Sequence, residues 1–202
     1  MNTYPVSEIF KSLQGEGFNV GREVVFIRLA GCNLACEWCD TDHTAASVLD
    51  EAEICQRVAR FDCRSVILTG GEPSLHDLTS LSHALRRSGV KWIGIETNGT
   101  NSLKPFRGMI DYITVSPKRG IPLDDSVWDM ADELRVVNDG LSVLDFDQYV
   151  GCGARYRYIS VLSFPDGGDN LFETIKLLSA VNERNTASWY LNQQIHKALN
   201  LR

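Results

Sequence analysis

The sequence contains no long hydrophobic run. No stretch approaches the roughly 18–20 consecutive apolar residues that a helix needs to cross a bilayer. Residues 1–10 also lack the basic start and apolar core of a secretory signal. These absences predict a cytoplasmic protein that neither crosses nor binds a membrane.

An excess of basic residues is also absent. Lys and Arg number 20 against 26 Asp and Glu, which gives a formal net charge of −6. Proteins that bind nucleic acid without specificity need a basic face, so direct binding to nucleic acid is not expected. There is no repeat, low-complexity tract or linker, and a chain of 202 residues fits one domain. We therefore expect residues 1–202 to form a single domain.

The cysteines do not have the even spacing of a disulfide scaffold. Cys32, Cys36 and Cys39 lie close together, whereas the other three are scattered at positions 55, 63 and 152. Disulfide-rich scaffolds are short and secreted, and a tight cysteine group in a cytosolic chain points to metal binding instead. The scattered cysteines are expected to be free thiols.

Short apolar, β-branched segments alternate with amphipathic ones along the chain. This alternation predicts a parallel sheet of the α/β class. A closed eight-stranded barrel usually needs about 250 residues, so we expect an open, partial TIM-like barrel of about six parallel strands with helices outside. The expected strands are 23–29, 65–69, 92–96, 112–115, 134–137 and 158–162, with 188–191 a further strand or extension, and the expected helices are 50–61, 78–89 and 171–181.

Unusual polar or glycine-rich segments follow four of the expected strands. In a parallel sheet such loops share the carboxyl edge, where α/β folds bind ligands. The four segments therefore predict one site at the mouth of the partial barrel. They are residues 31–41, 70–73, 97–99 and 116–118.

The first of these loops carries the spacing C-x3-C-x2-C through Cys32, Cys36 and Cys39. Three thiolates suit a soft metal. A structural zinc site takes four ligands and an electron-transfer cluster usually takes four cysteines. Three cysteines would leave one iron of a cluster open to an external ligand. His43 is the nearest candidate for a fourth ligand, so a zinc site remains an alternative.

This cysteine spacing, with Trp38 before the last cysteine, resembles the signature of the radical S-adenosylmethionine (SAM) superfamily. The segment Gly70-Gly71-Glu72-Pro73 resembles the GGEP motif of that superfamily, which holds the amino group of SAM. The resemblance implies that Cys32, Cys36 and Cys39 hold a [4Fe-4S] cluster. The cluster would cleave SAM reductively to a 5′-deoxyadenosyl radical, while the protein positions and shields the reactants. A reducing partner such as flavodoxin or ferredoxin would supply the electron.

The Gln14-Gly15-Glu16-Gly17 segment and its surroundings resemble the opening of the 7-carboxy-7-deazaguanine synthase family. The likeness extends over segments 9–17, 26–32, 38–41, 69–73, 96–99, 116–118 and 194–200. It implies ring contraction of 6-carboxy-5,6,7,8-tetrahydropterin to 7-carboxy-7-deazaguanine with release of ammonia. SAM would be regenerated, Mg²⁺ would assist, the product would enter queuosine and other 7-deazapurine biosynthesis, and the protein would be a homodimer.

Arg28 is the charged residue most in need of an explanation. Period-two alternation places it on the same face of its strand as Val24 and Phe26. A buried arginine without a partner is costly, so an anionic ligand or an internal salt bridge, for example to Glu96, would account for it. The family uses the matching arginine for the substrate carboxylate.

The resemblance also assigns roles to other positions. Gln14, Glu16 and Arg28 are expected to act in catalysis, and Thr41 is expected to be a Mg²⁺ ligand. Expected substrate contacts are Leu13, Gln14, Gly15, Arg28 and Thr69. Expected SAM contacts are Trp38, Cys39, Asp40, Gly71, Glu72, Ser116, Pro117 and Lys118.

The sequence departs from the family after the sixth expected strand. The family often has a Gln-Pro pair there, whereas residues 161–165 contain none, so no SAM contact is assigned to this segment. His196 and Lys197 either close the substrate end or lie in a surface tail. Two rival interpretations are a glycyl-radical activating enzyme, which would not need the Q-G-E-G segment or Arg28, and a non-catalytic zinc module, which leaves GGEP unexplained.

Overall fold

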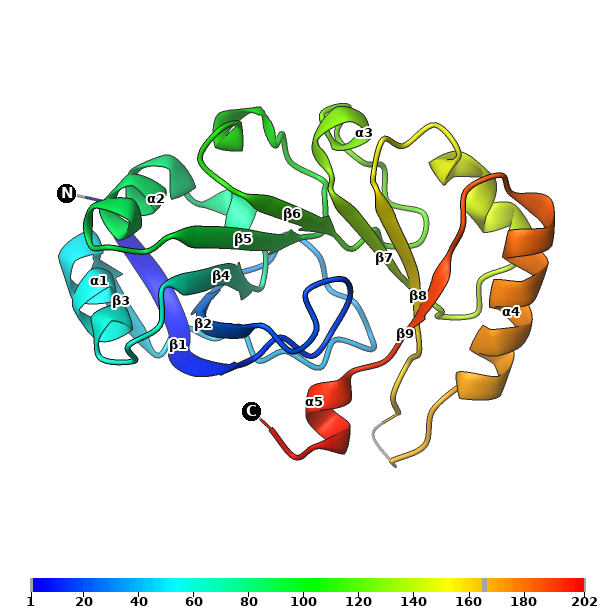
Figure 1. Cartoon of the computed structure of the whole chain (residues 1–202), viewed down its shortest axis with the longest axis horizontal. Coiled ribbons are helices and arrows are strands. Elements are labelled where there is room, and N and C mark those ends of the chain that lie inside the picture. The colour runs from blue at the N-terminus through cyan, green and yellow to red at the C-terminus, as the bar shows by residue number, and fades with distance from the viewer. Residues whose placement is uncertain (1, 165–166, 202) are drawn as a thin grey trace.

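The computed structural model describes residues 2–164 and 167–201, and it is built around one nine-stranded sheet in the order β3-β1-β2-β4-β5-β6-β7-β8-β9. Figure 1 shows the sheet as an open arch with helices on its outer side. The strands are β1 (Thr3–Leu13), β2 (Glu23–Leu29), β3 (Ser47–Asp50), β4 (Ser65–Gly70), β5 (Trp92–Thr97), β6 (Tyr112–Val115), β7 (Glu133–Val137), β8 (Tyr156–Ser160) and β9 (Tyr190–Asn192).

The expected α/β class and open barrel are confirmed, with differences at the two edges of the sheet. Seven strands, β2 and β4–β9, run parallel rather than about six, because Tyr190–Asn192 pairs with β8 as a strand. At the other edge β1 pairs antiparallel with β2 and β3, and neither β1 nor β3 was predicted. Pro5 and an irregularity between Val6 and Glu8 obscure the alternation of β1.

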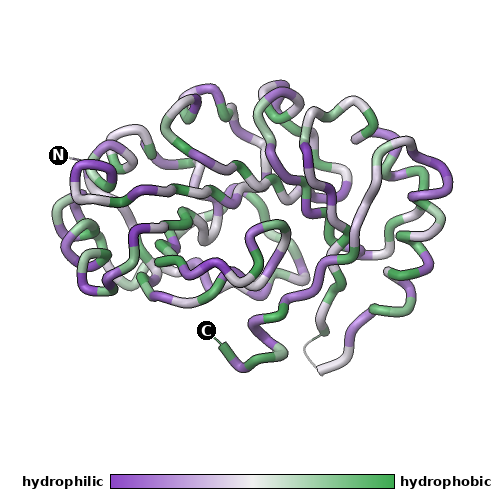
Figure 2. Tube along the Cα trace, viewed as in Figure 1, coloured by the Kyte–Doolittle hydropathy of each residue, from purple (hydrophilic) through white to green (hydrophobic). Residues whose placement is uncertain are grey.

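The helices cover the outer face of the sheet. The expected helices correspond to α1 (Glu51–Ala59), α2 (Leu78–Arg87) and α4 (Leu171–Arg184), and two short ones are α3 (Val127–Met130) and α5 (Ile195–Ala198). Figure 2 shows hydrophobic and hydrophilic stretches alternating along α1 and α4, as expected for helices with one buried face. Between β5 and β6 the structure has only the short 3-10 helix Lys104–Phe106, in place of a full crossover helix.

Asp50 starts α1 with a capping box. Its side chain accepts a hydrogen bond from the backbone N–H of Glu53 at 2.8 Å, and the Glu53 carboxylate accepts one from the backbone N–H of Asp50 at 2.9 Å. The reciprocal bonds satisfy amide groups that the first helical turn leaves free. They fix where α1 begins after the edge strand β3.

Two apolar clusters lie on the two faces of the sheet. The larger one joins the sheet to the helices and includes Ile27, Leu68, Ile93 and Leu81. A smaller one, on the inner face of the arch, consists of Phe10, Val24, Phe26 and Ile67, with Trp92 packed against it. The inner face therefore has an apolar zone at β1, β2 and β4.

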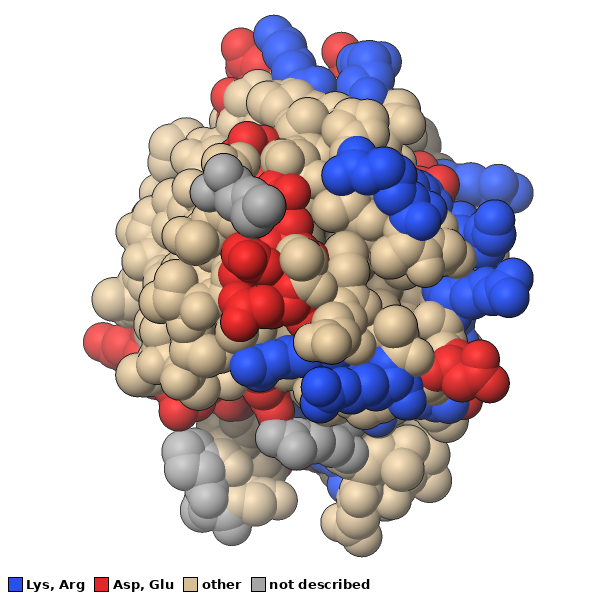
Figure 3. Space-filling view, turned by 90° about the vertical axis from the view of Figure 1, so that its left-hand side faces the viewer, with Lys and Arg blue, Asp and Glu red and all other residues tan. Residues whose placement is uncertain are grey.

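Charged side chains gather on the outer surface. Figure 3 shows the flank at the left of Figure 1, where α1 lies, with acidic side chains grouped together and basic side chains in separate groups around them. In α1 itself the acidic Glu51 and Glu53 occupy the first turn and Arg57 the last, which complements the helix dipole. No helix within residues 2–164 and 167–201 is long and apolar enough to span a membrane.

Substitution Asp50→Ala is expected to lower the free energy of unfolding by about 1 kcal/mol, because it removes the N-terminal cap of α1. Urea unfolding of the anaerobically prepared protein, followed by circular dichroism, measures this change. Asp50→Asn is the matched control, since asparagine caps a helix about as well. Equal destabilisation by the two variants would contradict the capping role.

Candidate active site

A cavity of about 260 Å³ lies at the carboxyl ends of the parallel strands. The loops after β2, β4, β5 and β6 all contribute to its wall, as the position of their motifs predicted. The strand ends of β7 and β8 and the segment after β9 complete it. The lining residues are Glu16, Cys32, Leu34, Ala35, Cys36, Trp38, Cys39, Asp40, Thr41, His43, Thr69, Gly70, Gly71, Glu96, Thr97, Asn98, Thr114, Ser116, Lys118, Arg135, Val137, Ser160, Val161, Leu162, Ser163, Gln194 and Lys197.

The three cysteines of the C-x3-C-x2-C segment line one wall of this cavity. Burial raises the pKa of the Cys36 thiol, the ammonium of Lys118 lowers it, and the neighbouring Cys39 and Cys32 raise it, so the three sulfurs share one electrostatic environment. Within the described residues no three His, Cys, Asp or Glu side chains are drawn together tightly enough to hold a metal ion. The cysteine loop has no helix or strand, and metal binding commonly orders such a loop.

Soft thiolates on a cavity wall are the donor set that an iron–sulfur cluster takes. Three of them leave one iron for a ligand from the cavity, so the residues present fit a [4Fe-4S] cluster. His43 also lines the cavity.

The Gly70–Pro73 segment runs alongside the end of β2. Gly71 donates its N–H to Leu29 O at 3.0 Å, and Glu72 donates its N–H to Gly31 O at 2.8 Å. A Cβ atom on Gly71 would lie 2.0 Å from Gly31 O. Glycine at position 71 therefore lets two backbone segments come into contact at the cavity.

The Glu72 carboxylate differs from the expectation that it faces SAM. It is fully buried and does not line the cavity. Its oxygens accept hydrogen bonds from Thr97 Oγ1 at 2.6 Å, Asn98 N at 2.6 Å and Ser74 N at 2.9 Å. With both oxygens occupied, Glu72 joins the loops after β4 and β5 and thereby shapes the cavity wall.

The loop after β6 places a cation beside the cysteine wall. Lys118 donates to the carbonyl and hydroxyl oxygens of Ser116 at 2.7 and 2.8 Å, and its ammonium lies 5.4 Å from the ring centre of Trp38. Trp38 in turn donates its indole N–H to Asp139 Oδ2 at 3.3 Å. Pro117 is buried and does not line the cavity. The predicted SAM contacts from these two loops therefore converge, except for Pro117.

Asp40 connects the cysteine loop to the C-terminal segment. Its Oδ2 accepts from Lys197 Nζ at 2.6 Å and from Gln194 Nε2 at 3.3 Å. Burial acts to raise the pKa of Asp40, but the contacts with Lys197 and Gln194 hold it below its ordinary value. The neighbouring Thr41 lines the cavity and donates to Asp40 Oδ1 at 3.4 Å. Lys197 therefore belongs to the cavity wall and not to a free tail.

The Gln14–Gly17 turn lies inside the arch. Gly15 O accepts from Ile195 N at 3.1 Å, and a Cβ atom on Gly15 would meet the His196 ring 2.2 Å away. Gly17 N donates to Asn192 Oδ1 at 2.8 Å. The turn thus packs against β9 and the segment that follows it.

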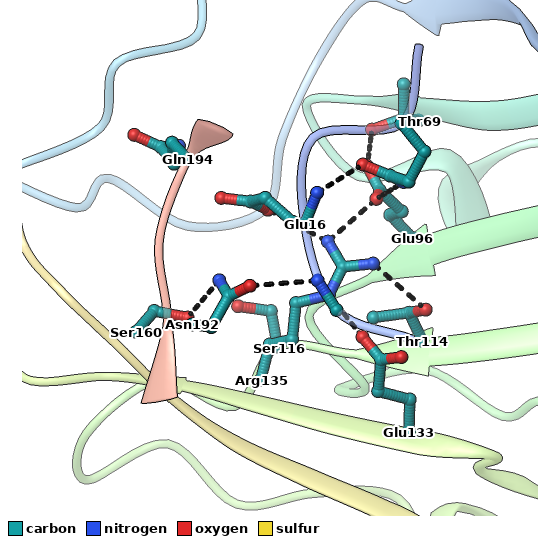
Figure 4. Close-up of polar contacts among 12 residues, drawn as sticks. Glu16, Thr69, Glu96, Thr114, Ser116, Glu133, Arg135, Ser160, Asn192 and Gln194 are labelled. Atoms are coloured by element: carbon teal, nitrogen blue, oxygen red, sulfur yellow. Dashed lines mark hydrogen bonds and ion pairs between the residues drawn. The ribbon is translucent and has the colours of Figure 1, made fainter. Parts of the chain in front are cut away.

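Beside this turn, Arg135 forms a buried network with several carboxylates (Figure 4). Its Nη1 lies 2.8 Å from Glu16 Oε2 and 2.9 Å from Glu96 Oε1, and its Nε donates to Glu133 Oε1. Glu96 also accepts from Gln14 Nε2 at 2.9 Å and from Thr69 Oγ1 at 3.0 Å. Burial acts to raise the pKa of Glu96, yet Arg135 and these hydrogen bonds hold it below its ordinary value.

Arg28 differs from the buried position expected for it. Its side chain is 33% exposed and forms an ion pair with Glu8 at 2.6 Å. The suggested partner Glu96 instead pairs with Arg135. Arg28 is level with Thr69 in the strand pairing, but it does not line the cavity. The antiparallel strand β1, which was not predicted, supplies the carboxylate of Glu8.

The remaining predicted substrate contacts divide into two groups. Glu16 and Thr69 line the cavity, whereas Leu13, Gln14 and Gly15 do not. Leu13 is 38% exposed at the end of β1. Gln14 donates a hydrogen bond to Glu96, which lines the cavity. After β8 the cavity is lined by residues 161–163. Pro165, the last residue of the segment that lacks the family's Gln-Pro pair, lies outside the described residues.

Sequence reasoning overlooked several residues of the site, above all Arg135 and Glu133. The alternation along β7 carried a signal, because Glu133 and Arg135 are charged residues on one face of an otherwise apolar strand. Asn192 and Ser160, which are hydrogen-bonded to each other at 2.9 Å, carried none.

Comparison with known proteins identifies the class to which this fold and cavity belong. Residues 26–120 match the model of the radical SAM superfamily. Together with the relatives described below, this match places the chain among the radical SAM enzymes, which use a [4Fe-4S] cluster and SAM.

The particular family follows from relatives that match along almost the whole chain. A 7-carboxy-7-deazaguanine synthase of Neisseria meningitidis is 39% identical, with 96% of this chain and 92% of the relative covered. One from Bacteroides thetaiotaomicron is 37% identical, with 98% of each covered. The crystal structure of QueE from Escherichia coli matches with a TM-score of 0.71 and 26% identity, over 95% of this chain and 94% of that one. The chain belongs to the 7-carboxy-7-deazaguanine synthase family.

Substitution Lys197→Ala is expected to loosen the C-terminal segment, because it removes the ion pair with Asp40. Hydrogen exchange of the amides of Ile195, Lys197 and Leu199 should become faster, while global stability changes by less than about 1 kcal/mol because the pair is exposed. The pair contributes above the ordinary pKa of Asp40, and its contribution disappears as the pH falls through the lowered pKa.

Lys11→Ala is the matched control, since Lys11 forms a comparable exposed pair with Glu23 at 2.8 Å. It should leave exchange of the C-terminal amides unchanged. Equal exchange in the wild type and Lys197→Ala would show that this ion pair does not hold the segment.

Proposed function

We propose that the protein converts 6-carboxy-5,6,7,8-tetrahydropterin to 7-carboxy-7-deazaguanine and ammonia. The observation that carries this proposal is the meeting of a three-thiol wall and a carboxylate-lined interior in one cavity. The full-length relatives named 7-carboxy-7-deazaguanine synthase support it, and they favour it over a glycyl-radical activating enzyme. The atoms of the substrate equal those of the two products, so no net oxidant or reductant is consumed and SAM is regenerated.

Cys32, Cys36 and Cys39 would hold the cluster through their sulfur atoms. When bound, the cluster and SAM supply a carbon-centred radical able to remove a hydrogen atom from the substrate. The residues of the wall bind and orient: backbone groups near Gly71 and the hydroxyl of Ser116 offer polar contacts, and Lys118 offers positive charge to a carboxylate. Asp40 and the Trp38 ring border the same space.

The substrate end would be formed by the interior of the arch. The amino-pyrimidinone edge of a pterin presents N–H donors, and the Glu16 carboxylate faces the cavity as an acceptor. Thr69 offers a hydroxyl beside it. Arg28 remains a predicted contact for the substrate carboxylate. That carboxylate would have to share Arg28 with Glu8 or displace Glu8 from it. Gln14 supports this end through Glu96.

Mg²⁺ is proposed to bind at Thr41. A hydroxyl and a nearby carboxylate oxygen of Asp40 suit this hard cation, which takes oxygen ligands and keeps several waters. We further propose flavodoxin or ferredoxin as the reducing partner and a homodimer as the assembly, as the sequence resemblance implies. Sedimentation of the anaerobic protein measures the assembly directly.

The activity is tested by anaerobic incubation with the carboxylated tetrahydropterin, SAM, Mg²⁺ and dithionite. Mass spectrometry should detect 7-carboxy-7-deazaguanine and ammonia in equal amounts, with far less 5′-deoxyadenosine because SAM is regenerated. Abundant 5′-deoxyadenosine without the deazaguanine product would retain the radical SAM class and overturn the assigned substrate.

Substitution Cys36→Ser is expected to abolish the cluster, because a hydroxyl replaces one of three thiolate ligands. Iron and sulfide in the reconstituted wild type should each be about four per chain, and in the variant they should fall to a small fraction of that. Cys152→Ser is the matched control, since Cys152 is buried away from the cavity. Full iron content in Cys36→Ser would contradict the assignment.

A further inference from the structure

Arg135 is a charged side chain enclosed in the interior of the arch. Its side chain is only 6% exposed, and it extends from β7, which lies between β6 and β8 in the sheet. Burying a guanidinium is costly unless its N–H groups are satisfied. Burial acts to lower the pKa of Arg135, but Glu96, Glu133 and Glu16 outweigh it and raise the pKa above its ordinary value. Arg135 is therefore a permanent cation.

The Glu133 carboxylate holds this guanidinium at its Nε atom. Glu133 is fully buried and accepts the Nε–H of Arg135, while its other oxygen accepts from Phe18 N at 2.9 Å and from Tyr112 Oη at 2.7 Å. Its position is thus fixed by β6 and by the turn that follows Gly17. Because Nε is held, the planar guanidinium presents its two remaining nitrogens in fixed directions.

One of those nitrogens, Nη1, contacts the two carboxylates that border the cavity. Nη1 contacts Glu16 and Glu96 at 2.8 and 2.9 Å, and Nη2 donates to Thr114 Oγ1 at 3.4 Å. Glu16 comes from the N-terminal turn and Glu96 from β5, so one nitrogen connects two elements that are distant in sequence. Among the described residues Arg135 is the only cation paired with Glu16.

We propose that Arg135, anchored by Glu133, is a positioning residue that sets the orientation of the Glu16 and Glu96 carboxylates for binding of the substrate. This inference rests on the proposed function for its substrate. Arg135 borders the cavity together with these carboxylates and holds both of them, so its loss should misplace them while leaving the cysteine wall intact. No role was assigned to this residue by the sequence motifs.

The first test compares Arg135→Gln and Arg135→Lys in the anaerobic holoenzyme. Arg135→Gln should lower kcat/KM for the pterin by about 100-fold, the size of effect that a misplacement of about 1 Å produces. SAM cleavage should continue and become uncoupled, with more 5′-deoxyadenosine formed per product. Arg135→Lys should recover part of the loss, because an ammonium keeps the charge but cannot form the same fork.

A second readout requires no substrate. Carboxyl carbon NMR of ¹³C-labelled glutamate follows the titration of Glu96 with pH. In Arg135→Gln the burial of Glu96 is no longer opposed by Arg135, so its pKa should rise, whereas in Arg135→Lys it should stay low. The groups facing Glu96 are Arg135, Glu16, Gln14 and Thr69, with Glu133 behind Arg135.

Controls separate this role from a loss of folding. Arg184→Gln removes an arginine from the exposed pair with Asp147 at 2.6 Å and should leave both readouts unchanged. Glu133→Gln keeps Arg135 but weakens its anchor, and it should lower kcat/KM while Glu96 stays ionised. Thermal unfolding of each variant gives the folded fraction used to correct the rates.

The outcomes are distinct. Unchanged kcat/KM and unchanged Glu96 titration in Arg135→Gln would overturn the inference, as would a rate loss that the folded fraction fully explains. If the wild type forms no deazaguanine product, the proposed function fails, and the titration alone then decides whether Arg135 controls the two carboxylates.

Discussion

Hydrogen bonds of the Gln14–Gly17 turn hold together the two ends of a sheet that does not close on itself. Ile195 N donates to Gly15 O at 3.1 Å, and Gly17 N donates to the Asn192 side chain at 2.8 Å. The turn follows β1 at one end of the sheet, and its partners lie at or beyond β9 at the other end (Figure 1). It therefore replaces the strand pairing that would complete a barrel.

The residue after the turn, Phe18, helps to fill the end of the arch that lies opposite the cavity. The Phe18 ring stacks on Tyr156 with ring centres 4.0 Å apart and lies 6.2 Å from Tyr112. Both tyrosines stand at the beginnings of parallel strands, opposite the end that carries the cavity. Glu133 binds both Phe18 N and Tyr112 Oη. Aromatic packing and a buried carboxylate thus close one end, and the ligand side opens only at the other.

The inner face consequently has two zones of different chemistry. Phe10, Phe26 and Ile67 form an apolar surface over β1, β2 and β4, while Glu96, Arg135 and their partners form a polar one over β5 and β7. The cavity itself is bordered by the polar zone and by the cysteine loop, whereas Phe10, Phe26 and Ile67 do not line it. The apolar zone therefore packs the inner face beside the cavity rather than within its wall.

Local patterns in the sequence predicted most of the sheet and the mouth of the site. The parallel strands are apolar and β-branched, and the glycine and cysteine motifs come directly after them in the sequence. The topology of a parallel sheet was therefore enough to predict that these motifs meet at one edge. The antiparallel strands β1 and β3 were not predicted. Pro5 and a register irregularity interrupt the alternation of β1, and β3 has only four residues.

The partners of charged residues were harder to predict. Arg28 was expected to be buried and to pair with a ligand or with a glutamate such as Glu96, but it meets Glu8 on the strand that was not predicted. Arg135 was not predicted to belong to the site, and its three carboxylate partners come from the N-terminal turn, β5 and β7. Such contacts join segments far apart along the chain, and no local periodicity encodes them.

The order in which the site is built during synthesis follows from one contact described above. Gln194 and Lys197 complete the wall that begins with the cysteines, yet they are separated from Asp40 by more than three quarters of the chain. On the ribosome the cysteine loop therefore emerges long before the residues that pair with Asp40. The contact between this loop and the C-terminal segment forms only when nearly the whole chain has been made.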